Sequence, residues 1–260
     1  MLKKRIIGVI TVRNGLAVQS FGYQKYLPIG KPECLVENFD RWGADEILIQ
    51  VIDRSPNLLG PDFELMEKLG KLGIQTPLIY SGGIRSVDDG VRLVQLGSDR
   101  IAIDALLHDN LPEVTSLSKI LGAQAIIASM PISLVRGLPM WFDYRSKNLK
   151  KISIDVIGLI ESDVISELVV TDWIHEGMTV GYDQGLVEIF ELKKTAIIAF
   201  GGISTPKQMK SLLQNRKVSA IAVGNFLSYK EHALQVFKEA LGGMPIRGPV
   251  YQSSISELVD

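Results

Sequence analysis

The stretch Ala196-Ile-Ile-Ala-Phe-Gly-Gly-Ile203 is an apolar run that ends in two glycines, and Pro77-Leu-Ile-Tyr-Ser-Gly-Gly-Ile84 repeats this pattern 119 residues earlier. A second offset of 121 residues relates Glu46 to Glu167, and each of these glutamates opens another apolar run. A spacing shared by several motifs is typical of an internal repeat, so the sequence predicts two similar halves. Further pairs at these offsets are Asp53 with Asp172 and Gly60-Pro-Asp62 with Gly181-Tyr-Asp183.

Short apolar runs alternate with helical patterns along the chain. The runs are apolar almost throughout, which is typical of parallel strands buried on both faces. Eight units of strand followed by helix predict a closed parallel (βα)8 TIM barrel, and we expect one domain over residues 1–260. The expected strands are Ile6–Thr11, Ile47–Ile52, Pro77–Ser81, Arg100–Asp104, Ala125–Met130, Glu167–Asp172, Ala196–Phe200 and Ala220–Gly224. The clearest helical patterns are Phe63–Leu72, Val87–Leu96, Pro206–Leu213 and Glu231–Leu241.

The composition is that of an ordinary globular protein. The chain has 260 residues, is 46% hydrophobic and carries a formal net charge of −1 from 28 basic and 29 acidic residues, which gives no reason to expect a nucleic acid partner. No apolar run is long enough to span a bilayer, so we expect no membrane segment and a cytoplasmic location. Cys34 is the single cysteine and the three histidines lack ligand spacing, so no disulfide, metal or other cofactor is predicted.

Functional groups of such barrels lie at the C-terminal ends of the strands. The titratable residues expected there are Asp53, Asp104 and Asp172, with His175 in the loop after the sixth strand. They are candidates for acid–base catalysis, although each type is also common at helix caps and in loops.

Two long segments, 13–32 and 133–150, follow the first and fifth expected strands. The second contains Met140-Trp-Phe-Asp-Tyr144, which indicates a small hairpin. Trp141 and Trp173 would lie at the same face, where an indole ring either stacks on a ligand or anchors a loop.

A phosphate site is predicted where glycines follow the last two strands. Gly201, Gly202 and Gly224 would let backbone N–H groups approach an oxyanion, and Glu176-Gly177 would join them from the sixth strand. The alternative is that these are simple turn glycines. Gly82 and Gly83 form a second, less favoured site, because the neighbouring Asp104 would repel a phosphate.

Four charged residues mark the opposite end of the barrel. Arg5, Glu46, Arg100 and Glu167 stand at the starts of the first, second, fourth and sixth strands. Two arginines and two glutamates are able to form a neutral ring, since buried charges persist when they are paired. Four separate, solvated strand ends are the other interpretation, and both stay open.

Several motifs resemble the HisF family, the cyclase subunits of imidazole glycerol phosphate synthase. The resemblance runs from Met1 to about Leu241 and implies a barrel that receives ammonia from a glutaminase docked at its N-terminal face. Ammonia would pass through the barrel to a phosphorylated small molecule at the C-terminal face. The motifs are Met1 to Gly15, Gly43-Ala-Asp-Glu-Ile47, Ser81-Gly-Gly-Ile84, Gly97-Ser-Asp-Arg-Ile101, Gly177 to Asp183 and Phe200-Gly-Gly-Ile203.

The sequence departs from that family at its catalytic positions. Thr11 and Pro131 stand where the family has its two catalytic aspartates, and neither side chain replaces a carboxylate base. Gln19 stands at the position of a lysine that helps to hold the substrate. Asp104 replaces an asparagine at one of the family's two phosphate sites. The resemblance therefore implies a barrel without cyclase activity of its own.

The N-terminal face keeps the family pattern. Arg5, Glu46, Arg100 and Glu167 match the family's charged ammonia gate, with arginine for lysine at Arg100, and Asp99 matches an aspartate that contacts the glutaminase.

This combination is similar to the WbuZ-type HisF paralogues of surface-polysaccharide clusters. They accompany a HisH-like glutaminase and an ATP-dependent sugar amidotransferase, and are implicated in making acetamidino sugars. We therefore expect an ammonia-delivering subunit of a glutamine amidotransferase complex, with the amidotransferase at the C-terminal face. One alternative is a cyclase of histidine biosynthesis with altered acid–base groups, drawn from Asp53, Asp172 or Glu176. Another is a phosphate-sugar-binding barrel without ammonia transfer.

Overall fold

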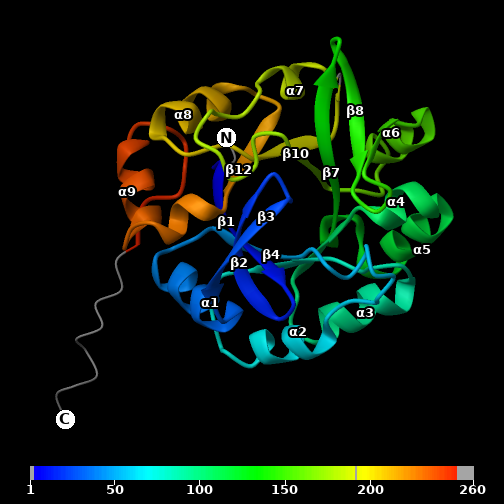
Figure 1. Cartoon of the computed structure of the whole chain (residues 1–260), viewed down its shortest axis with the longest axis horizontal. Helices are drawn as coiled ribbons and strands as arrows, with labels where there is room; N and C mark the ends of the chain where they lie inside the picture. The colour runs from blue at the N-terminus through cyan, green and yellow to red at the C-terminus, as the bar shows by residue number, and fades with distance from the viewer. Residues whose placement is uncertain (1–2, 191, 251–260) are drawn as a thin grey trace.

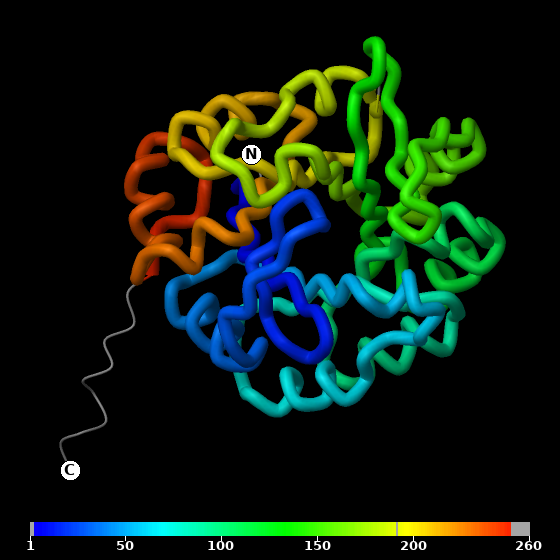
Figure 2. The backbone as a smooth tube through the Cα atoms, in the orientation of Figure 1, coloured from blue at the N-terminus to red at the C-terminus, as the bar shows by residue number. Residues whose placement is uncertain are grey.

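The computed structural model describes residues 3–190 and 192–250 and shows a closed barrel (Figures 1 and 2). Eight strands pair in parallel in the order β10-β11-β12-β1-β4-β5-β6-β7, and β7 pairs with β10 to close the ring. The predicted (βα)8 architecture is therefore confirmed. The strands are β1 (Arg5–Arg13), β4 (Glu46–Val51), β5 (Leu78–Ser81), β6 (Arg100–Ile103), β7 (Ile126–Val135), β10 (Glu167–Asp172), β11 (Ala196–Phe200) and β12 (Val218–Val223).

Helices surround this barrel, as the ribbon shows (Figure 1). Most expected bounds hold within two residues, and the last helix begins at Ala233 because His232 before it adopts a left-handed backbone (φ 57°). The helices are α1 (Pro32–Arg41), α2 (Phe63–Gly70), α3 (Val87–Gln95), α4 (Ala105–Asp109), α5 (Leu111–Leu121), α6 (Ile154–Ile160), α7 (Gly185–Glu188), α8 (Pro206–Gln214) and α9 (Ala233–Ala240), with 3-10 turns η1 (Ala123–Ala125) and η2 (Asn225–Ser228).

The strands are buried on both faces. On β1, Ile6 and Ile10 belong to the core between barrel and helices, whereas Ile7 and Val9 belong to a second core inside the barrel. This alternation follows from the two-residue period of a strand and explains the nearly continuous apolar runs. The inner core is Ile7, Val9, Leu48, Ile79, Ala102, Ile127, Val169, Ile198, Phe200, Ala220 and Ala222.

Backbone contacts of equivalent glycines support the predicted repeat. A Cβ added at Gly82 would lie 2.2 Å from the carbonyl oxygen of Val51, and one at Gly201 would lie 2.4 Å from that of Asp172. Both glycines also have positive φ (129° and 105°), so a side chain is disfavoured at each position by the backbone conformation as well as by the close carbonyl oxygen. The counterpart of Asp172 is thus Val51, and the pairing of Asp172 with Asp53 suggested by the sequence is wrong by two residues.

The helices that follow these glycines begin alike. Ser86 caps α3 in a capping box with Asp89, and Thr205 caps α8 in the same way with Gln208. Each hydroxyl accepts a hydrogen bond from the backbone N–H three residues on. The two boxes are 119 residues apart, the offset that relates the glycine pairs.

Two hairpins rise from the C-terminal ends of the strands. One consists of β2 (Leu16–Phe21) and β3 (Lys25–Gly30), and it lies in front of the barrel strands in Figure 1. The other consists of β8 (Leu138–Asp143) and β9 (Asn148–Lys151), with β8 antiparallel to the extended end of β7. The hairpin predicted within residues 133–150 is confirmed, and the segment 13–32 forms a second one.

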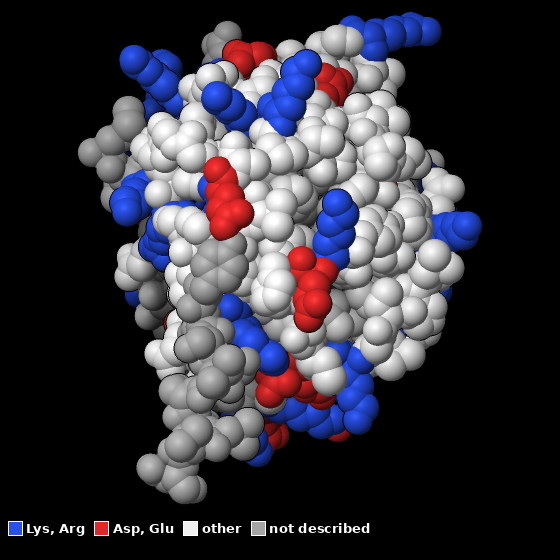
Figure 3. Space-filling view, turned by 90° about the vertical axis from the view of Figure 1, so that its left-hand side faces the viewer, with Lys and Arg blue, Asp and Glu red and all other residues white. Residues whose placement is uncertain are grey.

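The surface charge, the helices and the metal-ligating residue types can each be compared with the expectations from the sequence. Acidic and basic side chains are interspersed among uncharged residues on the face drawn in Figure 3. Within the described ranges, no helix is both long and apolar enough to cross a bilayer. In the same ranges no three His, Cys, Asp or Glu side chains come together as a metal site.

Candidate functional site

The four charged residues at the N-terminal end of the barrel form one closed ring. Arg5 donates hydrogen bonds to Glu46, over 2.7 Å from Nη1 to Oε2, and to Glu167. Arg100 also contacts both acids, with 3.1 Å from Nη1 to Glu46 Oε1 and 2.8 Å from Nη2 to Glu167 Oε2. Arginine and glutamate therefore alternate around the barrel axis.

The environment of this ring favours the charged forms of Glu167 and Arg5. Burial opposes ionisation of Glu167, but Arg5, Arg100 and Ser219 outweigh burial and lower the pKa of the Glu167 carboxyl. Burial also opposes the charge on Arg5, yet Glu167 and Glu46 raise its pKa. The ring side chains are only 9–16% exposed, so their mutual pairing is what makes the burial tolerable.

The barrel interior becomes apolar immediately above the ring. Along β1 the inward positions run from Arg5 through Ile7 and Val9 to Thr11, and the middle two belong to the inner core. Polar residues return at the other end, where Gln50, Ser81, Ser129 and Thr171 line a cavity. The axis thus has a charged end, an apolar middle and a polar open end.

The cavity at the C-terminal face has a volume of about 770 Å³. Both hairpins contribute aromatic walls: Tyr23 and Tyr26 come from the first, and Phe142 and Tyr144 from the second. Phe142 stacks on Trp173, with ring centroids 4.1 Å apart and planes at 12°. The Tyr23 hydroxyl donates to Gln50 Oε1 over 3.1 Å, which fixes one ring against the barrel.

Thr11 on β1 and Pro131 on β7, which the resemblance places at the family's catalytic positions, lie toward this end of the barrel. Pro131 lines the cavity, whereas Thr11 is 5% exposed and does not line it. Pro131 lies beyond Ala128, the last residue at which β7 pairs with β6, whereas on its other side β7 still pairs with β10 and Pro131 lies opposite Thr171.

The carboxylates that a cyclase with altered acid–base groups would need have other partners. Asp53 lines the cavity, but its Oδ2 accepts the Asn14 N–H over 2.7 Å. Asp172 is 2% exposed and accepts hydrogen bonds from the Asp183 N–H (2.8 Å) and the ring of His175 (2.7 Å from Nδ1). These contacts hold the loop after β10, and they turn Asp172 away from the cavity lining.

Glu176 ties the first hairpin to the barrel. Its Oε2 accepts the Ser20 hydroxyl over 2.9 Å and the Tyr23 N–H over 3.3 Å, and its backbone carbonyl accepts the Gly22 N–H. Burial raises the pKa of the Glu176 carboxyl, although the same hydrogen bonds oppose the rise. This carboxylate therefore faces the hairpin and not an open site.

The predicted phosphate glycines divide into two groups. Gly82 and Gly83 line the cavity, together with Asp104. Gly177 packs against the hairpin, since a Cβ there would lie 2.0 Å from the Ser20 carbonyl oxygen. Gly201, Gly202 and Gly224 are outside the lining as well, so phosphate binding at that group stays a prediction.

Most of the aromatic wall is not predicted from the sequence. Trp173 is a predicted ligand-facing residue, whereas Tyr23, Phe142 and Tyr144 become evident as such only in the structure. The available signal was the density of aromatic residues in the two long segments. Trp141, by contrast, is 3% exposed and stacks on His108 at 3.5 Å, so it anchors the second hairpin.

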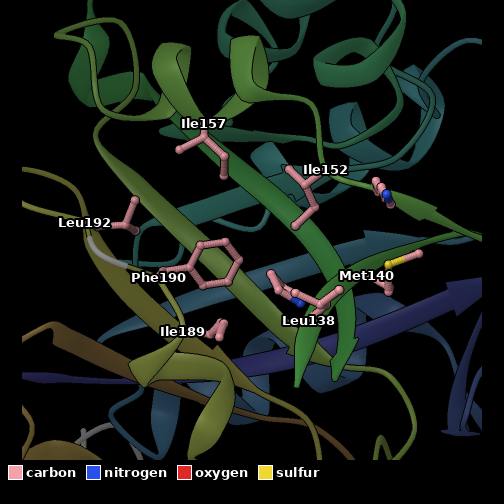
Figure 4. A pocket seen from close by; sticks show the side chains of 9 residues that line it. Leu138, Met140, Ile152, Ile157, Ile189, Phe190 and Leu192 are labelled. Carbon is pink, nitrogen blue, oxygen red and sulfur yellow. The ribbon is translucent and has the colours of Figure 1, made fainter. Parts of the chain in front are cut away.

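A separate apolar hollow of about 430 Å³ lies outside the barrel, between the second hairpin, α6 and the segment after α7 (Figure 4). Among the described residues that line it, Lys151 is the titratable one. The remaining lining residues are Leu138, Pro139, Met140, Ile152, Ile157, Ile189, Phe190 and Leu192.

Comparison with known proteins identifies the family. The model of a family described as histidine biosynthesis protein matches residues 5–233. The imidazole glycerol phosphate synthase subunit HisF of Staphylococcus epidermidis is 30% identical over 257 residues, which cover 95% of this chain and 100% of the relative. The subunits of the same name in Staphylococcus saprophyticus and Natranaerobius thermophilus are 29% and 26% identical, again over 95% of this chain and their full lengths. A match over most of the chain, on a (βα)8 barrel with two similar halves, shows that this protein belongs to the histidine biosynthesis protein family and is HisF-like.

Proposed function

We propose that this HisF-like barrel is the ammonia-delivering subunit of a glutamine amidotransferase complex, active in surface-polysaccharide (O-antigen) biosynthesis. The observation that carries the proposal is the alternating ring of Arg5, Glu46, Arg100 and Glu167, which lies on the axis below an apolar interior and an open cavity. A HisH-like glutaminase would dock at the N-terminal face and release ammonia beneath the ring.

The ring has the properties that a gate for ammonia requires. Its charges are paired, so the closed ring would hinder the entry of water, and a neutral molecule as small as ammonia needs only a gap. Moving one side chain would open such a gap. Ser166 accepts from Arg100 over 2.8 Å and offers that arginine a partner beyond the ring. Above the ring, the apolar inner core would carry neutral ammonia and disfavour ammonium.

Docking at the N-terminal face is supported by Asp99. This residue is exposed beside Arg100, and its Oδ2 accepts the Leu78 N–H over 2.8 Å, which fixes the carboxylate at the edge of that face. At the opposite face, the cavity between the two hairpins would receive the acceptor or a group presented by a sugar amidotransferase. A phosphorylated ligand near Gly201, Gly202 and Gly224 belongs to the same proposal.

The second candidate is the cyclase of histidine biosynthesis, which the names of the relatives favour. The geometry disfavours it, because Asp172 and Glu176 are engaged in loop and hairpin contacts and Asp53 accepts a backbone N–H. A phosphate-sugar-binding barrel without ammonia transfer is the third candidate. It would leave the paired ring without a role in function.

Docking is tested by mixing the chain with a HisH-type glutaminase from the same genome and measuring complex formation by size-exclusion chromatography. We expect a complex that Asp99→Arg disrupts and that Lys147→Glu, a matched charge reversal at the cavity, leaves intact. Absence of a complex, or equal disruption by both variants, would favour the phosphate-binding barrel.

The gate is tested with the complete set of partners by comparing glutamate released with aminated product formed. Arg5→Ala leaves Arg100 as the one remaining arginine of the ring for both Glu46 and Glu167 and opens a gap beside them, so we expect more glutamate per product as ammonia escapes. Arg100→Lys preserves the charge and should keep the native ratio. An unchanged ratio in both Arg5→Ala and Glu167→Ala would refute the gate.

A further inference from the structure

Asp104 occupies an unusual position for an aspartate. It follows β6 and precedes α4 at the N-cap, yet its side chain makes no capping hydrogen bond. An aspartate at this position ordinarily accepts an N–H of the first turn. Here Asp104 lines the cavity instead, and its Oδ1 is shielded from solvent without a hydrogen-bond partner in the described part of the chain. The Tyr144 hydroxyl and the Trp141 indole lie close enough to the carboxyl group to lower its pKa, but neither satisfies this oxygen.

We propose that Asp104 anchors the protonated nitrogen of a ring-bearing ligand, an amine or an amidine, in this cavity. A buried carboxylate oxygen without a donor is costly, and a cationic N–H donor is the partner that offsets this cost best. A phosphate would be repelled at the same place. The site therefore selects the charge of the ligand group that reaches it.

The walls of the cavity suit the rest of such a ligand. The stacked pair Phe142 and Trp173 presents a flat surface, and Tyr23 and Tyr144 also line the space near Asp104. Aromatic faces attract both flat rings and cations. Trp173 Nε1 is buried and has no partner among the described residues, so its N–H offers a donor for a polar ring substituent.

The electrostatic environment matches this role. Burial raises the pKa of Asp104 to about 7, while Tyr144, Arg145 and Trp141 partly oppose the rise. A bound cation favours the ionised carboxylate, so binding should weaken as the pH falls below about 7. The titratable groups that interact with Asp104 are Tyr144, Arg145 and Asp143 from the second hairpin and Tyr23 from the first. The charged residues Arg13, Asp53 and Lys147 also line the cavity.

This inference deepens the proposed function by naming the ligand class of the upper cavity. A binding test on the purified chain needs neither glutaminase nor ammonia. Failure of the gate and failure of this subsite are therefore separate results.

The probe is benzamidine, a flat ring with an amidinium group, and its neutral counterpart is benzamide. Isothermal titration calorimetry at pH 8 should show benzamidine binding at least tenfold more tightly than benzamide. At pH 6 we expect benzamidine to bind about tenfold more weakly than at pH 8, since roughly one pH unit below the pKa leaves a tenth of the carboxylate ionised. Benzamide should change little.

The matched variants are Asp104→Asn and Asp109→Asn. They remove the same charge from neighbouring positions, but Asp109 does not line the cavity and instead pairs with Arg145 over 2.5 Å. Asp104→Asn should weaken benzamidine at least tenfold at pH 8 and abolish its pH dependence, whereas Asp109→Asn should do neither. Equal effects of the two variants, or equal binding of the two probes by the native chain at pH 8, would overturn the proposal. The second outcome requires no variant to fold.

Discussion

The ammonium group of Lys238 lies 2.9 Å from the carboxylate of Asp45, and both side chains are almost fully excluded from solvent. Asp45 also accepts the Ile6 N–H over 2.7 Å, and Lys238 donates to the Gly43 carbonyl over 2.7 Å. This buried pair fastens α9 to the starts of β1 and β4. It therefore holds the last helix against the N-terminal end of the barrel, next to the first strand.

Removing one member of this pair should destabilise the barrel strongly. Lys238→Met keeps most of the apolar stem but leaves the Asp45 carboxylate buried without its cation. We expect the free energy of unfolding to fall by about 3–5 kcal/mol, as measured by urea denaturation at pH 7. Lys68→Met is the control, because Lys68 pairs with Glu64 on the exposed face of α2 and should change stability little. Equal effects of the two substitutions would contradict this account.

The equivalent glycines should be equally intolerant of a side chain. Gly82→Ala and Gly201→Ala each combine a positive φ with a Cβ too close to a carbonyl oxygen. We expect each to cost about 1–3 kcal/mol in thermal or urea unfolding. Gly158→Ala within α6 meets no atom within 4 Å and should instead stabilise by about 0.4–1 kcal/mol. A large difference between the first two variants would argue against equivalent halves.

The barrel could be predicted from sequence because its strands depend on local patterns. A run such as Ala196–Phe200 is apolar because both faces are buried, and the paired offsets show that the pattern occurs twice. The proximity of the four charged ring residues could be predicted for the same reason, because residues at the strand starts come together at one end of any barrel. Whether they paired depended on side-chain geometry, which the pattern does not contain.

The upper site was harder to predict because long-range contacts decide it. The Glu176 carboxylate faces Ser20, which is 156 residues away in sequence, and so it holds a hairpin. Asp53 and Asp172 looked equivalent because each lies near a strand end, yet one is two residues beyond β4 and the other is the last residue of β10. That shift of two residues separates a cavity-lining group from one that does not line the cavity.

The raised pKa of Asp104 predicts that stability depends on pH. Its folded-state pKa of about 7 exceeds the ordinary value near 3.8. The stabilisation from its protonated form is therefore complete below about pH 4 and is lost as the pH rises through 7. The Asp104→Asn variant has no titrating group at this position. Its free energy of unfolding should therefore increasingly exceed that of the native chain between pH 4 and 7, and the difference should then become constant.

We expect the difference in the free energy of unfolding to reach about 1–3 kcal/mol. This is less than the whole pKa shift would give, because Asp104 is partly open to the cavity and solvent screens its charge. Urea denaturation at unit steps from pH 4 to 8 measures it. Asp163→Asn, at a carboxylate that is 92% exposed, should differ from the native chain by a constant amount. A difference for Asp104→Asn that is also constant would show that this carboxyl is not titrating in the folded state.

We expect Thr11 and Pro131 to leave the chain without cyclase activity. The chain should show no turnover with ammonia and the substrate of HisF, because Thr11 and Pro131 supply no acid–base group at the two family positions. Loss of one such group typically costs about 10²–10⁴ in rate. Thr11→Asp alone should not restore activity, since Pro131 still lacks a titratable group and its ring still fixes the strand backbone.

The new carboxylate of Thr11→Asp would also be poorly placed. Thr11 faces the barrel interior above Val9, is 5% exposed, and does not line the cavity where a substrate would bind. An aspartate there would be desolvated, so we expect lower stability without gain in rate. Thr11→Asp combined with Pro131→Asp is the stricter test, because it restores both groups. Product formation is followed by absorbance with ammonium as the nitrogen source, which removes any dependence on a glutaminase. Turnover by the unmodified chain at a rate comparable to HisF would establish it as a cyclase and contradict the proposed role in ammonia delivery.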